Sequence, residues 1–166
     1  MNEPQKPPQP QKFVDPGRVA GIDYGTVRIG IAISDPIRIL ASPYENYTRQ
    51  SIELDALRFR DLVEEEDVKL FVVGLPIHLD GRESQKSIES REFAKWLTKE
   101  TGVPAEMFDE RFTSAAAETM LMDANLTSKR RKKRMDMVAA QILLSAFLEA
   151  GCPRGRDERD QNQSLG

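Results

Sequence analysis

The sequence predicts an α/β protein with a mixed five-stranded sheet, in which three antiparallel meander strands precede parallel strands and helices cover both faces. Three observations support this class. Residues 18–48 contain three strand-like segments with no helical pattern between them. From residue 51 onward, helical and strand periodicities alternate. Residues 68–76 form a dense Val and Leu run, which is typical of a strand buried on both faces. A meander followed by alternating helices and strands favours a mixed sheet.

The meander is the first part of this pattern. Residues 18–25 and 28–35 are both strand-like and are joined by a tight turn at Gly25 and Thr26. Glycine can adopt a positive φ, which some turns of this kind need. Residues 38–48 predict the third strand.

Two helices flank the apolar fourth strand. The first is predicted over residues 51–67, with Ser51 as its N-cap. The second is predicted over residues 84–102 and stops at Gly102. The spacing of apolar residues places these side chains toward the core: Ile52, Ala56, Phe59 and Val63 in the first helix, and Ile88, Phe93, Trp96 and Leu97 in the second.

The last third of the chain contains the remaining predicted strand and helices. Residues 103–110 predict the fifth strand, and residues 113–126 a short helix capped by Thr113 or Ser114. Residues 131–151 predict a helix that is apolar nearly all round, so we expect it to be largely buried.

Composition sets the domain limits and the compartment. We expect one folded domain over residues 17–150, with disordered tails at 1–16 and 151–166, because the tails offer little to bury. The chain has no apolar run of the roughly 18 residues that a membrane span needs. Its only cysteine is Cys152, which fits a reducing cytoplasm. We therefore predict a cytoplasmic protein without a membrane partner.

Acidic residues occupy positions where apolar side chains would serve packing better. Asp23 ends the first strand, Glu110 ends the fifth with Asp109 beside it, and Asp136 lies within the apolar last helix. If the first strand is central and the last helix packs over its end, these side chains converge. Converging carboxylates repel one another, but Mg²⁺ or Mn²⁺ binds to such oxygens and can activate water against a phosphodiester. We predict Asp23, Glu110 and Asp136 as catalytic and metal-binding residues.

Simpler interpretations of these acids stay open. An acid at a strand end is commonly a turn residue or a helix cap. The tripeptide of residues 109–111 also recurs at residues 157–159 in the polar tail, where it carries no function. Asp136 has the least structural justification, because its neighbours are apolar.

The net charge of −3 argues against a protein that coats nucleic acid by bulk charge, but the chain has one basic run at residues 129–134. Lysine and arginine are the residues that bind nucleic-acid backbones. The basic run could instead be a solvated loop. Arg111 could form a surface ion pair, and His78 could have a structural role. The predicted nucleic-acid-binding residues are Arg28, His78, Arg111, Arg130, Arg131, Lys132, Lys133 and Arg134.

Four segments, residues 21–36, 72–81, 109–114 and 135–148, resemble the YqgF (RuvX) family in order and spacing. Members of that family are similar to Holliday junction resolvases and are regarded as candidate nucleases of pre-16S rRNA. The resemblance implies a ribonuclease H-like fold, metal-dependent phosphodiester hydrolysis, and maturation of the 5′ end of pre-16S rRNA in the cytoplasm. It matches the family's three acids to Asp23, Glu110 and Asp136 of this chain.

Other functions remain open at this point. A Holliday junction resolvase would act on branched DNA, usually as a dimer, so a monomer and a homodimer are both possible. A non-catalytic nucleic-acid-binding regulator would use the basic run and not the acids. A kinase of the actin–hexokinase type would need two such domains around its nucleotide, and this chain has room for one.

Overall fold

The computed structural model describes residues 16–78, 80–112 and 128–152. The two predicted tails lie almost entirely outside the described residues, and the predicted helix at 113–126 lies wholly outside them. No helix in the described part of the chain is long and apolar enough to cross a membrane.

A five-stranded sheet forms the centre of the fold, with the strand order β3-β2-β1-β4-β5. β1 pairs antiparallel with β2, and β2 pairs antiparallel with β3. On the other side, β1 pairs parallel with β4, which pairs parallel with β5. The mixed sheet and its central first strand are therefore confirmed. The bounds are Arg18–Asp23 for β1, Arg28–Ser34 for β2, Ala41–Thr48 for β3, Val68–Leu75 for β4 and Ala105–Asp109 for β5.

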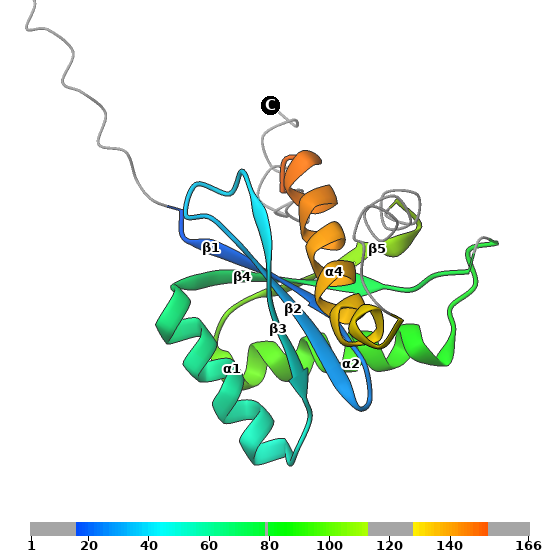
Figure 1. Ribbon diagram of the computed structural model, residues 1–166, viewed down its shortest axis with the longest axis horizontal. Helices are drawn as coiled ribbons and strands as arrows, with labels where there is room; N and C mark the ends of the chain where they lie inside the picture. The colour runs from blue at the N-terminus through cyan, green and yellow to red at the C-terminus, as the bar shows by residue number, and fades with distance from the viewer. Residues whose placement is uncertain (1–15, 79, 113–127, 153–166) are drawn as a thin grey trace, which may run out of the picture.

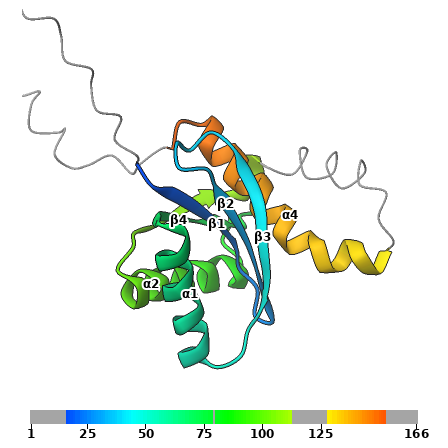
Figure 2. The same cartoon turned by 60° about the vertical axis from the view of Figure 1, so that its left-hand side comes forward.

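Helices cover both faces of the sheet, as predicted. α1 (Ile52–Glu66) and α2 (Gln85–Thr101) lie on one face, and α4 (Ser128–Glu149) crosses the other (Figures 1 and 2). Phe59, Phe71 and Phe93 are buried in the core between the sheet and the first two helices. A second core, which includes Leu144 and Phe147 of α4, fills the opposite face.

Local signals set the ends of α1 and α2. Ser51 caps α1 as predicted, because its hydroxyl accepts the Leu54 N–H at 3.2 Å. Ser84 caps α2 through the Ser87 N–H at 3.2 Å. α2 ends at Gly102, whose φ of 74° is the left-handed conformation that glycine adopts without strain.

The third strand starts later than predicted, at Ala41 and not at residue 38. The turn before it explains the difference. One carboxylate oxygen of Asp35 accepts the N–H groups of Ile39 at 2.7 Å and Leu40 at 2.8 Å, and Arg38 has a φ of 59°. A side chain that binds these backbone donors keeps the segment out of the sheet.

Two predicted core positions are wrong. Ile52 is 65% exposed and Ile88 is 46% exposed. Both lie in the first turn of their helices and line the rim of a cavity instead of facing the sheet. Near Ile52, the buried position is Asp55, which accepts hydrogen bonds from the Tyr47 hydroxyl at 2.7 Å and from Arg49 Nε at 3.0 Å. Asp55 is therefore buried in this turn of α1, where the apolar pattern predicted Ile52 to be buried.

Small residues in the sheet allow α4 to approach closely. A Cβ on Gly30 would lie 1.9 Å from the carbonyl oxygen of Asp136, and a Cβ on Gly21 would lie 2.9 Å from that of Ala140. Burial along α4 is uneven, since Met135 is 47% exposed and Leu144 is fully buried. The predicted burial of this helix therefore applies to its C-terminal half.

Candidate active site

Asp23 is the last residue of the central strand β1. Side chains alternate along a strand, so Asp23 faces the same side as Gly21, which contacts α4. Asp23 is half-buried at the carboxyl end of the sheet. The pKa of Asp23 is raised to about 7, mainly by burial and to a smaller extent by the negative charges of Glu110 and Asp136, while the positive charge of Lys86 opposes the rise. Such a shift is typical of a carboxylate that is shielded from water and lies near other negative charges.

Glu110 reaches this site from the opposite edge of the sheet. It begins η1, a short 3-10 helix (Glu110–Phe112) that directly follows β5. Its carboxylate turns back over β4, where a Cβ on Gly74 would lie 2.3 Å from Glu110 Oε1. Burial raises the pKa of Glu110, with a smaller contribution from the charge of Asp109. Since β4 separates β5 from β1, this direction brings the Glu110 carboxylate toward Asp23.

Asp136 enters from α4, which covers the face of the sheet toward which Asp23 points. Its backbone lies against Gly30 of β2, which fixes its position over the meander. Its carboxylate faces Arg28, with Oδ2 at 3.5 Å from Arg28 Nε. The charge of Asp136 also acts on Asp23. The structure thus brings together Asp23, Glu110 and Asp136, together with Arg28, from four separate parts of the fold.

Lys86 is a residue that sequence reasoning missed. It lies in the first turn of α2, and its positive charge lowers the pKa of both Asp23 and Glu110. The start of α2 is tied to the end of β4, because the Ser87 hydroxyl donates to the carbonyl oxygen of Pro76. A lysine in the first turn of a helix, after a capping serine, is not part of any recognisable functional motif. Its role follows only from where the β4–α2 connection ends.

The donor set suits a hard divalent cation, since carboxylate oxygens are the ligands that Mg²⁺ and Mn²⁺ prefer. Within the described residues, no group of three or more His, Cys, Asp or Glu side chains is close enough to hold a metal ion. Arg28 already faces the Asp136 carboxylate at 3.5 Å, so a metal would compete with this cation for Asp136.

Arg111 is not directed at the acids in this arrangement. Its Nε donates to Asp109 Oδ2 at 2.8 Å, and its backbone N–H donates to Asp109 Oδ1 at 2.9 Å. The hydrogen bond from Arg111 holds the pKa of Asp109 below its usual value. Asp109 is therefore an ion-pair partner in this structure, and Glu110 is the acid that turns toward the sheet.

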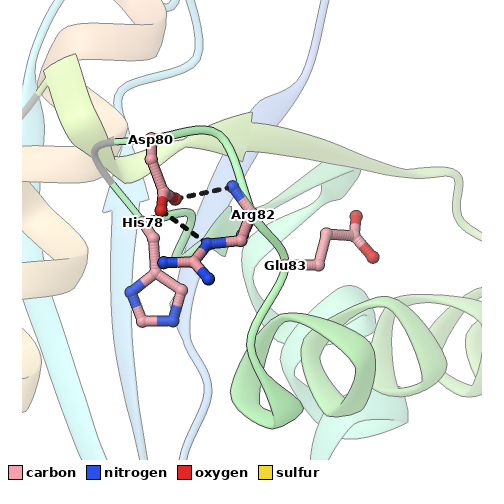
Figure 3. Close-up of a pocket in the computed structure, with 4 residues that line it drawn as sticks. All are labelled: His78, Asp80, Arg82 and Glu83. Atoms are coloured by element: carbon pink, nitrogen blue, oxygen red, sulfur yellow. Dashed lines mark hydrogen bonds and ion pairs between the residues drawn. The ribbon is translucent and has the colours of Figure 1, made fainter.

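His78 lies on an exposed loop between β4 and α2 (Figure 3). Its N–H donates to the Arg82 carbonyl oxygen at 3.1 Å, and an ion pair joins Arg82 to Asp80. These residues line an open pocket of about 570 Å³ from which Glu83 points away, and none of the three acids lines it. The basic residues Arg130, Arg131, Lys132, Lys133 and Arg134 lie in the first turns of α4, and their side chains are outside the described part of the structure.

Comparisons with known proteins identify the family. A family model described as "RuvX: Holliday junction resolvase" matches residues 17–150. A protein of Rhodopirellula baltica named "Putative pre-16S rRNA nuclease" is 54% identical over 143 residues, which cover 86% of this chain and 83% of that protein. A protein of Koribacter versatilis with the same name is 39% identical over 144 residues, which cover 87% of this chain and 92% of that protein.

Solved structures identify the fold. The structure of "T. thermophilus RuvC in complex with Holliday junction substrate" aligns with a TM-score of 0.52 at 16% identity, over 82% of this chain and 96% of RuvC. A Fowlpox virus resolvase in complex with Holliday junction DNA aligns with a TM-score of 0.53 at 9% identity, over 82% of this chain and 99% of the resolvase. These likenesses confirm the ribonuclease H-like fold. The extent of the family match and the identity to the curated relatives show that this chain belongs to the RuvX (YqgF) family.

Proposed function

We propose that this protein is a divalent-metal-dependent nuclease that hydrolyses phosphodiester bonds in structured RNA. One observation carries the proposal. Asp23, Glu110 and Asp136 are distant in the sequence, yet the charges of Glu110 and Asp136 both act on Asp23 at the end of the central strand. Packing alone gives no reason to gather acids there. Family membership supports the nuclease class.

In this proposal Asp23, Glu110 and Asp136 are the catalytic residues and hold Mg²⁺ or Mn²⁺. When bound, the metal lowers the pKa of water and stabilises charge on the leaving oxygen. Asp23 sits at the centre of the group, while Gly74 leaves the space that the Glu110 carboxylate occupies. Lys86 and Arg28 add positive charge beside the acids, where a phosphate would bind.

The proposed substrate is the 5′ end of pre-16S rRNA, processed in the cytoplasm during ribosome biogenesis. The names of the curated relatives support this choice. We propose that residues 17–150 form the nuclease unit and that the basic residues at 130–134 bind the phosphate backbone, together with Arg28, His78 and Arg111. Each neutralised phosphate would make binding more dependent on salt.

A second candidate substrate is branched DNA. The family's description as a Holliday junction resolvase favours it. Symmetric cutting of a junction usually needs a dimer, whereas cutting one RNA strand needs only a monomer. The oligomeric state during cleavage therefore separates the two substrates. A regulator that binds nucleic acid without cutting it is the remaining alternative, and it would not depend on the acids.

The test is a cleavage assay with purified full-length protein, a pre-16S rRNA 5′ fragment and a four-way DNA junction, each with Mg²⁺, Mn²⁺ or EDTA. We expect metal-dependent cutting of the RNA that falls at least a hundredfold in Asp23→Asn. Glu64→Gln on α1 is the matched control, because Glu64 is an exposed acid in the last turn of α1, next to the start of β4 and not to its carboxyl end. Cutting of the junction alone would favour the resolvase. An Asp23→Asn variant as active as wild type would overturn the catalytic assignment.

A further inference from the structure

A second cavity opens at the end of β1 that carries Asp23, but on the face of the sheet that α1 and α2 cover. It has a volume of about 500 Å³, within the range of small-ligand pockets. Its wall includes Tyr24, which follows β1, Arg49, which follows β3, and Phe93 and Trp96 of α2. Ile88, at the rim, is 46% exposed. An aromatic cavity with an apolar rim open to water is unusual for a purely structural cluster.

The aromatic rings in this wall form a connected series. The Tyr24 and Phe93 centroids lie 5.0 Å apart with planes inclined by 35°, and those of Phe93 and Trp96 lie 5.4 Å apart at 33°. The Arg49 guanidinium lies 5.6 Å from the Tyr24 ring centre and 5.8 Å from that of Phe93. Asp55 holds Arg49 in place through a 3.0 Å contact to Nε. Phe93 itself is buried, so the half-buried Tyr24, Trp96 and Arg49 are the groups in this wall on which an unpaired nucleobase can stack.

This cavity and the acidic site meet at the same end of β1. Tyr24 directly follows Asp23, and its ring packs against the core beneath α1 and α2, whereas Asp23 faces α4. In α2, too, one residue belongs to the cavity and its neighbour to the acidic site. Gln85 lines the cavity, and the next residue, Lys86, acts on the charges of Asp23 and Glu110. A strand with one phosphate at the acids would therefore have to turn around this end of β1 to place a base in the cavity.

Charge in the cavity favours a base over a phosphate. Glu89 and Glu92 of α2 line it, and carboxylates repel phosphate groups. The same carboxylates can accept hydrogen bonds from an exocyclic amino group, as acidic residues do from cytosine N4. Uracil lacks such a group. The lining therefore suits an amino-bearing base in a strand whose backbone stays outside, at Lys86 and the acids.

We propose that the cavity formed by Tyr24, Arg49, Ile88, Glu89, Phe93 and Trp96 binds an unpaired, amino-bearing nucleobase next to the phosphate that is cut. This inference rests on the proposed nuclease function and specifies which part of its substrate the protein recognises. It predicts that the enzyme prefers substrates with an unpaired cytosine or adenine beside the cleavage position over substrates with uracil there. Base stacking on protein aromatics also contributes substantially to affinity for single strands.

Trp96 provides a direct readout, because it is the only tryptophan in the chain. The full-length protein is titrated in EDTA with oligocytidine or oligouridine of about eight nucleotides, a typical site size for single-strand binding. We expect oligocytidine to quench the Trp96 fluorescence and to bind several times more tightly than oligouridine. EDTA separates binding from cleavage, so the result does not depend on activity.

Variants at the rim complete the test. Ile88→Glu places a charged side chain at the entrance of the cavity and should weaken oligocytidine binding at least tenfold. Leu57→Glu is the matched control, because Leu57 is a 51% exposed apolar residue of α1 outside this cavity. Glu89→Gln should reduce the preference for oligocytidine. The proposal is overturned if neither oligonucleotide quenches Trp96, or if Ile88→Glu binds like wild type. A wild-type protein that quenches but cuts no RNA would instead refute the proposed function and leave the pocket assignment standing.

Discussion

The carboxylate of Glu110 occupies the space above Gly74, where a Cβ would lie 2.3 Å from Glu110 Oε1. The glycine in β4 thus makes room for an acid that comes from the end of β5. This relationship explains how β4 and β5, which α2 separates in the sequence, together form one side of the site.

Gly74→Ala should therefore impair activity without unfolding the protein. The new methyl group meets the end of a flexible side chain, so Glu110 can rotate away at a cost of less than about 1 kcal/mol in stability. We expect cleavage to fall about tenfold or more while the thermal midpoint stays within a few degrees. Gly30→Ala is the contrasting variant, because its methyl group would meet the Asp136 backbone and should destabilise the fold by several kcal/mol. Full activity in Gly74→Ala would contradict the placement of Glu110.

The raised pKa of Asp23 predicts how stability depends on pH in the absence of metal. The folded-state pKa of about 7 lies above the ordinary aspartate value of 3.8, so the folded protein binds more protons than the unfolded chain between these values. Stability should therefore fall as pH rises from about 4 to 7 and then level off. Asp23→Asn removes this term and should gain about 2–4 kcal/mol relative to wild type over that range. Urea denaturation in EDTA at several pH values measures the difference. Parallel profiles for the two proteins would show that Asp23 ionises normally.

Lys86 should lower the pKa of Asp23 through its positive charge. In Lys86→Gln, the Asp23 pKa should rise above its wild-type value, and NMR titration of the metal-free protein in EDTA can follow that carboxyl directly. Lys95→Gln is the matched control, since Lys95 lies on the same helix but lines a different cavity. We also expect Lys86→Gln to weaken RNA binding, because a phosphate at the acids loses a nearby cation. An unchanged titration of Asp23 would mean that Lys86 does not act on the site.

Arg28 contacts Asp136 at 3.5 Å and is 51% exposed, so it can bind a phosphate once Asp136 turns toward a metal. Arg28→Gln should weaken RNA binding and reduce the slope of log affinity against log salt by about one. Affinity for Mn²⁺ should not fall, because the variant releases Asp136 from a competing cation. Lys69→Gln is the control, since Lys69 is an exposed residue at the opposite end of β4. A loss of Mn²⁺ affinity in Arg28→Gln would show that Arg28 is needed to position Asp136.

Much of the fold could be predicted from the sequence, because local patterns determine it. The apolar run of β4, the Ser51 cap and the stop at Gly102 each act within a few residues. The errors arise where a side chain overrides the pattern. Asp35 delays β3 by binding backbone donors, and Asp55 takes a buried position that an apolar pattern cannot assign to an acid.

The acids of the candidate site could be proposed from the sequence, but the residues around them could not. Asp23 and Asp136 stand out because they interrupt apolar segments. The position of Glu110 over Gly74, the effect of the Lys86 charge on the acids, and the contact of Arg28 with Asp136 depend on strand order and on how α4 crosses the sheet. These relationships join residues separated by long stretches of chain, and no short sequence window contains them.

The most direct test of this account is a crystal of the full-length protein soaked in Mn²⁺ and measured by anomalous diffraction. We predict anomalous density bound by Asp23, Glu110 and Asp136, with the Asp136 carboxylate turned away from Arg28. Its absence from an Asp23→Asn crystal treated in the same way would confirm the assignment. Mn²⁺ bound elsewhere, with these three carboxylates unliganded and Asp136 still paired with Arg28, would contradict it.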